Sequence, residues 1–164
     1  MTKTKIPSPI GTLTAETEEG FVFRLELGGD SRADSVPSDD TARQLIRELD
    51  EYFRGDRTAF SLKVRPAGTP FQQAVWAQMR KIPYGQTKTY GELAEAIGKP
   101  GASRAVGHVC HINPILLLIP CHRVVGASGI GGFAHGTDLK RVLLGLERET
   151  LTAFRHPYPE DQGY

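Results

Sequence analysis

Cys121 and His122 are the side chains of this sequence best suited to covalent chemistry, because a thiol beside an imidazole can act as a nucleophile. They stand together in the run Pro120-Cys121-His122-Arg123. Only the thiolate attacks, and an unperturbed cysteine with a pKa of about 8.5 is only about 3 % ionised at pH 7. A cation or base that lowered this pKa by about two units would make the thiolate dominant. The four residues alone leave open the alternative of a buried structural cysteine beside a surface histidine.

The segment before Cys121 predicts how the thiol is positioned. Residues 115–119 are five consecutive aliphatic residues, which predict a buried strand. Pro120 is expected to end this strand, because proline cannot donate a hydrogen bond to a neighbouring strand. A second short strand is predicted at residues 123–125. We therefore expect the thiol and the imidazole to lie where a rigid element stops.

Basic residues gather on the segment that holds Cys121. Residues 71–125 carry six Lys/Arg against two Asp/Glu, whereas residues 1–70 carry ten against twelve and residues 126–164 carry four against five. A local positive field favours both a thiolate and a polyanionic partner. The net charge of +1 by itself predicts no nucleic-acid binding, and a solvated basic surface is the alternative explanation of the local excess.

Length and composition restrict the class of protein. A chain of 164 residues can form one domain or two small ones. No apolar run approaches membrane-spanning length, and the first residues lack the apolar centre of a signal peptide. The two cysteines do not suggest a disulfide framework. These features predict a cytoplasmic protein whose thiols are kept reduced.

The first part of the chain predicts a strand-rich lobe. Residues 12–16 and 21–27 alternate apolar and polar side chains around Glu19-Gly20, which is typical of a hairpin. Helical spacing follows at residues 41–54, then a short strand candidate at 60–64 and a linker at 65–68. We therefore predict an N-terminal domain at residues 1–68 and a C-terminal domain at residues 69–164, with a polar tail from about residue 156.

The second part predicts a helix-turn-helix pattern. Thr69 before Pro70 begins one helix, and Thr89 with Glu92 three residues later forms a capping box for a second that ends at Gly98. A third helix is predicted at about residues 102–111, and a last one after Thr137. Two short helices joined by a tight Gly/Pro turn can bind DNA, although a helical hairpin packed on a core gives the same pattern.

Several motifs in one order make a more specific signal. These motifs are Phe71-Gln72-Gln73-Ala74-Val75-Trp76, Ile82-Pro83-Tyr84-Gly85, Thr89-Tyr90-Gly91-Glu92-Leu93-Ala94, Arg104-Ala105-Val106-Gly107, Asn113-Pro114, Ile119-Pro120-Cys121-His122-Arg123-Val124, Lys140 and Leu143-Leu144-Gly145-Leu146-Glu147. Through them the second half, and more weakly the first, resembles the O6-alkylguanine-DNA alkyltransferases, also called methylated-DNA–protein-cysteine methyltransferases.

The resemblance implies a fold and a reaction. The fold is α/β, with a small ribonuclease-H-like, strand-rich N-terminal lobe and a winged-helix-like (helix-turn-helix) C-terminal lobe. Cys121 attacks the alkyl carbon on guanine O6 and keeps the alkyl group as a thioether, so each chain reacts once. The resemblance implies no metal and no cofactor. It also implies that His122 is the base toward Cys121 through a water, that Glu147 orients His122, and that Tyr90 supplies a proton to the departing guanine.

The implied partner is double-stranded DNA that contains O6-alkylguanine, contacted through its minor groove. Arg104 resembles the family's finger that fills the space left by a flipped nucleotide. The small residues Ala102, Ser103, Ala105 and Gly107 would let the helix approach the duplex closely. No membrane partner is expected. A monomer is expected, with cooperative binding along DNA left open, as is a place in the nucleoid if the source is bacterial.

The remaining implied residues position the site or shape the base pocket. Asn113 resembles the family's hinge between the DNA-binding helix and the active-site segment. The implied pocket residues are Val124, Ser128, Gly131, Gly132, Phe133 and Lys140. Phe133 departs from the family, which usually has a tyrosine there whose hydroxyl reaches guanine O6. Either another donor serves in its place, or the reaction is slower, or the register of the loop differs by one residue.

Three other interpretations stay open at this point. Cys110-His111 lies eleven residues before Cys121-His122, and two such pairs could bind a metal, although neither pair has the usual close cysteine spacing. Cys110 fits better as a small buried residue of its helix. An alkyltransferase-like protein that only binds lesions is a second interpretation, but those relatives lack the cysteine. A cysteine hydrolase that turns over is the third.

Overall fold

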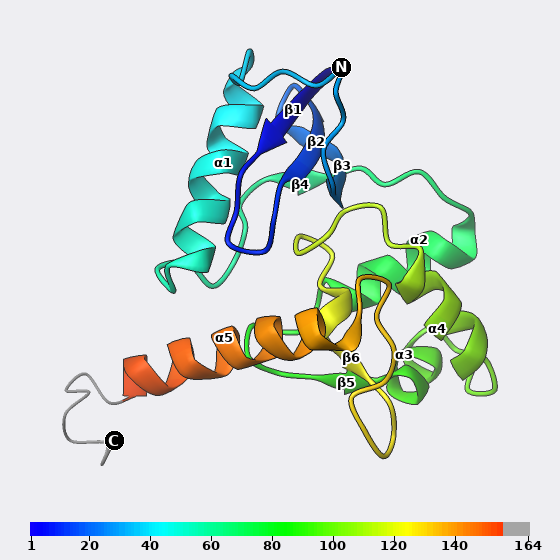
Figure 1. The fold of residues 1–164 in the computed structure, drawn as a ribbon. Helices are drawn as coiled ribbons and strands as arrows, with labels where there is room; N and C mark the ends of the chain where they lie inside the picture. The colour runs from blue at the N-terminus through cyan, green and yellow to red at the C-terminus, as the bar shows by residue number, and fades with distance from the viewer. Residues whose placement is uncertain (156–164) are drawn as a thin grey trace.

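The computed structural model of the chain describes residues 1–155 and has a four-stranded sheet at its N-terminal end (Figure 1). The polar tail predicted from about residue 156, with His156, lies outside the described residues. β1 and β2 are antiparallel, as are β2 and β3, whereas β4 pairs with β3 in parallel. The strands lie side by side in chain order: β1 (Thr2–Ile6), β2 (Leu13–Glu18), β3 (Phe21–Leu27) and β4 (Lys63–Val64).

The predicted hairpin is confirmed as β2 and β3. Glu19 and Gly20 connect the two strands with φ of 47° and 88°, so both adopt the left-handed conformation of a mirror-image turn that matches strand twist. The strand predicted at residues 60–64 is confirmed only for its last two residues, as β4. β1 was not predicted from the sequence, because its alternating threonines and lysines show no clear apolar face.

α1 (Asp40–Phe53) packs on the sheet, where it contacts β1 and β2 (Figure 1). The Asp39 side chain caps the helix by accepting a hydrogen bond from the Ala42 backbone N–H, and Gly55 follows the helix end with a φ of 79°. The predicted helix at 41–54 is therefore confirmed within one residue. Leu45, Leu49 and Tyr52 lie on its buried face.

The three helices predicted between residues 69 and 111 are confirmed, and the structure shows that they pack against one another. They are α2 (Pro70–Met79), α3 (Tyr90–Ala96) and α4 (Ser103–His111). Both predicted capping threonines are confirmed: the Thr69 hydroxyl accepts from the Gln72 N–H at 3.2 Å, and the Thr89 hydroxyl accepts from the Glu92 N–H at 3.0 Å. These caps orient the start of each helix by local chemistry alone.

A short two-stranded ladder and a long helix complete the described chain. β5 (Lys88–Thr89) pairs in parallel with β6 (Val124–Val125), and α5 (Thr137–Arg155) begins at the residue predicted to cap it. The α/β fold class, with a strand-rich first part and a helical second part, is confirmed. Among the described residues, no helix combines the length and apolar character needed to cross a membrane.

The strand predicted at residues 115–119 is wrong. The segment is a buried turn in which the Ile119 N–H donates to the Ile115 carbonyl at 3.0 Å. Leu117 adopts a left-handed φ of 70°, a conformation that a regular strand cannot contain. A run of aliphatic residues indicates that a segment is buried but not which backbone conformation it adopts. In this segment the backbone forms hydrogen bonds within the turn and to β3, instead of to two flanking strands.

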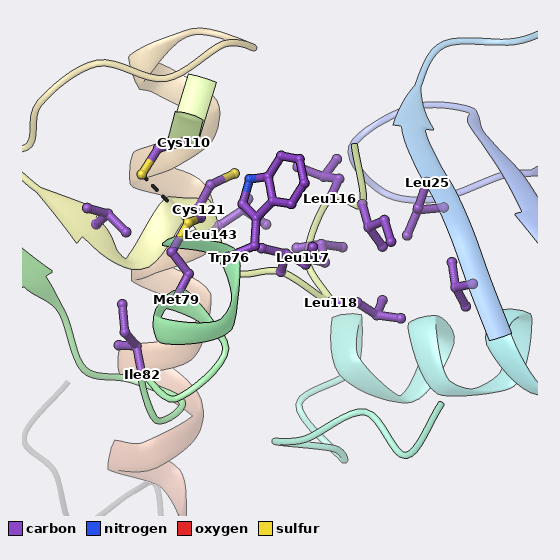
Figure 2. Close-up of a cluster of buried hydrophobic side chains, with 14 of the residues drawn as sticks. Leu25, Trp76, Met79, Ile82, Cys110, Leu116, Leu117, Leu118, Cys121 and Leu143 are labelled. Carbon is purple, nitrogen blue, oxygen red and sulfur yellow. Dashed lines mark hydrogen bonds between the residues drawn. The ribbon is translucent and has the colours of Figure 1, made fainter. Parts of the chain in front are cut away.

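The buried turn joins the two parts of the molecule. The Leu25 N–H of β3 donates to the Pro114 carbonyl and the Leu116 N–H donates back to the Leu25 carbonyl, both at 2.9 Å. Figure 2 shows Leu116, Leu117 and Leu118 between Leu25 on one side and Trp76 on the other. One continuous core therefore runs from the sheet through the turn to the helices that surround Cys121.

Candidate active site

Cys121 begins a single turn of 3-10 helix, η1 (Cys121–Arg123), directly after Pro120. Asn113 holds the segment that leads to it: its side-chain amide donates to the Ile119 carbonyl at 2.7 Å, and its carbonyl oxygen accepts from the Ile115 N–H at 3.0 Å. One side chain thus closes both ends of the buried turn, as expected of a residue that bonds to nearby backbone. The thiol is fixed by this turn and not by the end of a strand.

The thiol of Cys121 is buried, and burial raises its pKa, although the Asn113 amide and the Lys140 ammonium act in the opposite direction. The expectation of a pKa lowered by nearby cations is therefore wrong for this structure. The sequence reveals neighbouring charges but not desolvation, which here outweighs them. Cys121 rests as a neutral thiol and needs a base to become a nucleophile.

Glu147 lies behind His122 at the centre of a buried network. Its Oε1 accepts from Arg123 Nε at 2.8 Å and from the Gly85 N–H at 3.0 Å. Its Oε2 faces His122 Nε2 at 2.5 Å and accepts from Arg123 Nη2 at 3.0 Å and Tyr52 Oη at 2.7 Å. These donors lower the pKa of Glu147 to about 2 despite its burial. The carboxylate is therefore charged and orients every group around it.

This carboxylate determines the tautomer of His122. A charged carboxylate only accepts hydrogen bonds, so His122 Nε2 carries the proton that points to Glu147. Nδ1 is then the basic nitrogen, and it is buried without a hydrogen-bond partner among the side chains and backbone of residues 1–152. Burial also lowers the pKa of His122, so the ring is neutral at rest. The arrangement provides a base next in sequence to the thiol, with its second nitrogen already held.

Sequence reasoning missed Arg123 and Tyr52 as members of this network. Arg123 is adjacent to the predicted pair, and its charge beside an essential carboxylate is a signal that could have been used. Tyr52 appeared only as an apolar position of α1. It precedes Glu147 by 95 residues, and no local pattern connects two positions so far apart.

A pocket of about 400 Å³ opens over Cys121. Tyr90 is half-buried in its wall, and its hydroxyl lies 3.4 Å from the Gly132 carbonyl. The N-terminal part of α4 forms another wall, where exposed Arg104 lies close to the opening. The residues that line the pocket are Tyr90, Ser103, Arg104, Gly107, Cys110, His111, Cys121, Gly132, Phe133 and Ala134.

Seven of the sixteen predicted site residues line this pocket, and the structure places the others around it. Ala102 and Ala105 are on or next to α4 but outside the lining, with Ala105 exposed. Ser128 is exposed in the glycine-rich loop, away from the lining. Gly131 is packed behind Tyr90 with a φ of 76°, and a Cβ there would lie 2.9 Å from the Tyr90 hydroxyl.

Lys140 supports the pocket from behind. Its buried ammonium donates to the Val124 carbonyl at 2.6 Å and to the Gly132 carbonyl at 2.9 Å, and burial lowers its pKa. Val124 is itself fully buried and outside the pocket lining. Lys140 therefore ties the loop that carries Gly132 and Phe133 to β6 and keeps that wall in place.

Cys110 is a small buried residue of α4, as expected. Its thiol lies 3.7 Å from the Met79 sulfur, and burial raises its pKa to about 12 (Figure 2). It shares the pocket with Cys121, but the raised pKa keeps its thiol protonated and therefore unreactive. No group of three or more metal-ligating side chains is found in the described part of the chain.

Comparisons with known proteins match both parts of the molecule. Residues 1–66 match the family model described as the ribonuclease-like domain of 6-O-methylguanine DNA methyltransferase, and residues 70–149 match that of its DNA-binding domain. A methylated-DNA–protein-cysteine methyltransferase of Methanosarcina acetivorans is 44 % identical over 146 residues, which cover 85 % of this chain and 94 % of the relative. One of Mycobacterium tuberculosis is 41 % identical over 153 residues, covering 90 % and 93 %.

Solved structures give the same result. The crystal structure of Mycobacterium tuberculosis OGT in complex with DNA aligns with a TM-score of 0.82 at 39 % identity, over 92 % of this chain and 94 % of that one. The structure of the O6-methylguanine methyltransferase of that organism aligns with a TM-score of 0.80 at 40 % identity, covering 93 % and 98 %. Fold and site together define a two-part DNA repair methyltransferase. The chain belongs to the 6-O-methylguanine DNA methyltransferase family and is an enzyme of the methylated-DNA–protein-cysteine methyltransferase class.

Proposed function

We propose that this chain repairs O6-alkylguanine in double-stranded DNA by transferring the alkyl group once, irreversibly, to Cys121. The observation that carries the proposal is the position of Cys121. Its thiol lines a pocket beside α4, and the His122–Glu147 pair lies behind it. DNA is the partner of the family, and one similar structure is a complex with DNA.

The chemistry follows from the buried thiol. His122 Nδ1 takes the proton of Cys121 through a water, and Glu147 stabilises the imidazolium that forms. The thiolate attacks the alkyl carbon in line, so that an S–C bond forms while the C–O6 bond breaks and its electron pair leaves on guanine. Tyr90 supplies a proton to the departing base and regains one from His122 through solvent. In sum the thiol proton moves to guanine and the alkyl group moves to sulfur.

Single use of each chain follows from the product. The alkyl group of a thioether does not leave the sulfur, since no group in the described site can attack or reduce the thioether.

The thiolate forms only together with its attack on the alkyl carbon, because burial makes a persistent thiolate costly in free energy. The buried cysteine therefore reacts only when a lesion and the base are both aligned.

DNA reaches the pocket only if the damaged nucleotide leaves the base stack, because the reacting carbon lies inside the duplex. In this proposal α4 enters the minor groove, and its small residues permit close approach while Arg104 occupies the vacated space.

Phe133 lies in the pocket wall but has no hydroxyl that could donate to guanine O6. The proposed transfer requires one chain only, and cooperative binding along DNA would appear as a sigmoidal isotherm on long duplexes.

In this proposal the chain has two domains, whose boundary we place at residue 68, and both contribute to alkyl transfer. The C-terminal domain holds the pocket, the thiol and the base, and the N-terminal domain packs against the turn that carries Asn113 and Cys121. A lesion-binding protein without transfer is disfavoured by Cys121 itself, and a cysteine hydrolase is disfavoured because the base pocket and α4 share one opening.

The test is a titration of the whole chain with excess duplex that contains O6-methylguanine. The proposal predicts a burst of repair that stops at one guanine restored per active chain, with an intact mass raised by one methyl group. Tight binding with an unchanged mass would favour the lesion-binding protein. Repair that continues past one equivalent with an unchanged mass would favour a turnover enzyme.

A further inference from the structure

Tyr52 connects the first part of the molecule to the carboxylate of the proposed reaction. It lies on α1, yet its hydroxyl donates to Glu147 Oε2 at 2.7 Å, and both side chains are at most 1 % exposed. Other side chains of the network, His122 and Arg123, come from the η1 segment in the second part of the chain. The N-terminal domain supplies no residue of the pocket lining. Through Tyr52 it nevertheless contacts Glu147, the carboxylate that holds His122.

The phenol of Tyr52 is a permanent donor in this position. Burial and the adjacent negative charge raise its pKa, so the hydroxyl keeps its proton. Its proton points to Glu147, because a charged carboxylate can only accept. Tyr52 therefore shares Oε2 with His122 Nε2 and Arg123 Nη2. Each additional donor reduces the negative charge that this oxygen can offer to the imidazole.

An aromatic cluster holds the ring of Tyr52 in place. The ring centroids of Phe53, Phe60 and Tyr84 lie 5.3, 5.5 and 6.0 Å from that of Tyr52. Two of these contacts are edge-to-face, a favourable geometry for aromatic pairs. The hydroxyl is thus aimed by packing and not by the hydrogen bond alone, which is what a group that orients another residue requires.

We infer that Tyr52 is a positioning residue through which the N-terminal domain sets the orientation of Glu147, and thereby of His122, for alkyl transfer. This inference rests on the proposed function. The groups that face His122 and Glu147 are Arg123, Lys140, Cys121, Tyr52 and Tyr84. Among them Tyr52 is a neutral donor whose hydrogen bond can be removed without changing the net charge of the site.

Removing the hydroxyl has two expected effects. Glu147 loses one of its fixed partners, so the base is less well oriented and the rate constant of transfer falls about threefold to tenfold. Oε2 then interacts more strongly with the protonated ring, which raises the pKa of His122. The acid limb of the pH–rate profile therefore moves to higher pH, by about half a unit. A loss of packing alone would not move this limb.

The experiment compares Tyr52→Phe with Tyr84→Phe in the full chain. Tyr84 lies in the same cluster, but none of the hydrogen bonds that Glu147 accepts comes from its hydroxyl, so it is a matched control. Single-turnover rates with O6-methylguanine duplex are measured from about pH 4.5 to 9, and the burst amplitude gives the fraction of folded chains. We expect the slower rate and the shifted acid limb in Tyr52→Phe but not in Tyr84→Phe.

Further arms separate the possible failures. In a Glu147→Gln background, Tyr52→Phe should cause no additional change in rate, since both act through the same carboxylate. If Tyr52→Phe does not fold, replacement of Tyr52 by 3-fluorotyrosine keeps the hydroxyl, makes it a stronger donor and should move the acid limb to lower pH. An unshifted profile in the variant that folds overturns the inference. A parent chain that repairs nothing would instead reject the proposed function.

Discussion

The two sides of Cys121 differ in how completely they are organised. Behind the thiol, Glu147 is fully buried and accepts hydrogen bonds from four residues. In front of it, the pocket is rimmed by exposed Arg104 and half-buried Tyr90, whose hydroxyl makes a long contact of 3.4 Å. The rear is built in the free protein, whereas the front is left for DNA to complete. Substitutions behind the thiol should therefore affect every substrate, whereas loss of the exposed Arg104 side chain at the rim should affect only duplex DNA.

The largest effect is expected from Cys121→Ser. The hydroxyl is a far weaker nucleophile than a thiolate and His122 cannot ionise it, so transfer should be abolished. Binding to lesion-containing duplex should stay within about threefold of the parent, because α4 and the pocket rim are unchanged. Gel-shift titration and a repair assay measure the two quantities, and residual transfer would contradict the role of Cys121.

Glu147→Gln should come next, because it breaks the rear network. The amide cannot neutralise buried Arg123 or stabilise charged His122, so the free energy of unfolding should fall by about 3–5 kcal/mol. Transfer by the chains that remain folded should slow at least about a hundredfold, equally for duplex and for free O6-benzylguanine base. Urea unfolding and single-turnover rates test this, and a loss confined to duplex would contradict it.

The same network predicts how stability depends on pH. The pKa of Glu147 is about 2 in the folded chain against 4.5 for a free side chain, so its charged form stabilises the fold. This contribution is complete above about pH 4.5 and is lost as the pH falls toward 2. Thermal unfolding of the parent should weaken across that window. In Glu147→Gln the part of the pH dependence due to this group should be absent, and an unchanged slope would argue against the assignment.

Arg104→Ala tests the front. Without a side chain to fill the stack, repair of duplex DNA should slow by about tenfold to a hundredfold, which corresponds to the few kcal/mol needed to extrude a base. Reaction with free O6-benzylguanine should change less than about twofold, since no base has to leave a stack. Equal losses on both substrates would remove the distinction between front and rear.

The smallest effect is expected from Phe133→Tyr. A hydroxyl added to the pocket wall can donate to guanine O6, and a neutral hydrogen bond contributes about 0.5–1.5 kcal/mol. The transfer rate should therefore rise about twofold to tenfold, with no change in DNA affinity. A rate below that of the parent would show that the ring at Phe133 does not face O6.

The sequence predicted what local chemistry determines. The capping residues Thr69 and Thr89 gave two helix starts, and Glu19-Gly20 gave the hairpin turn, because these signals act within four residues. The aliphatic run 115–119 showed burial but not shape, since a buried strand and a buried turn need the same side chains. Leu117 has a left-handed backbone conformation, but leucine is not a residue type that indicates a turn.

The site residues that belong to sequence motifs could be predicted, whereas those brought to the site only by the fold could not. Cys121, His122 and Asn113 stand in recognisable motifs, and the structure places them together. Tyr52 joins Glu147 only because α1 packs against the second part of the chain. Lys140 was expected to shape the pocket directly. Its ammonium instead lies behind the pocket wall, where it donates hydrogen bonds to the carbonyls of Val124 and Gly132.

One measurement tests the central claim most directly. The full chain is reacted with excess O6-methylguanine duplex, digested, and mapped by tandem mass spectrometry alongside Cys121→Ser treated in the same way. The proposed mechanism predicts one methyl group per chain, all of it on the peptide that contains Cys121, and none on the serine variant. Methyl found on Cys110 or any other side chain, or on the variant, would contradict it.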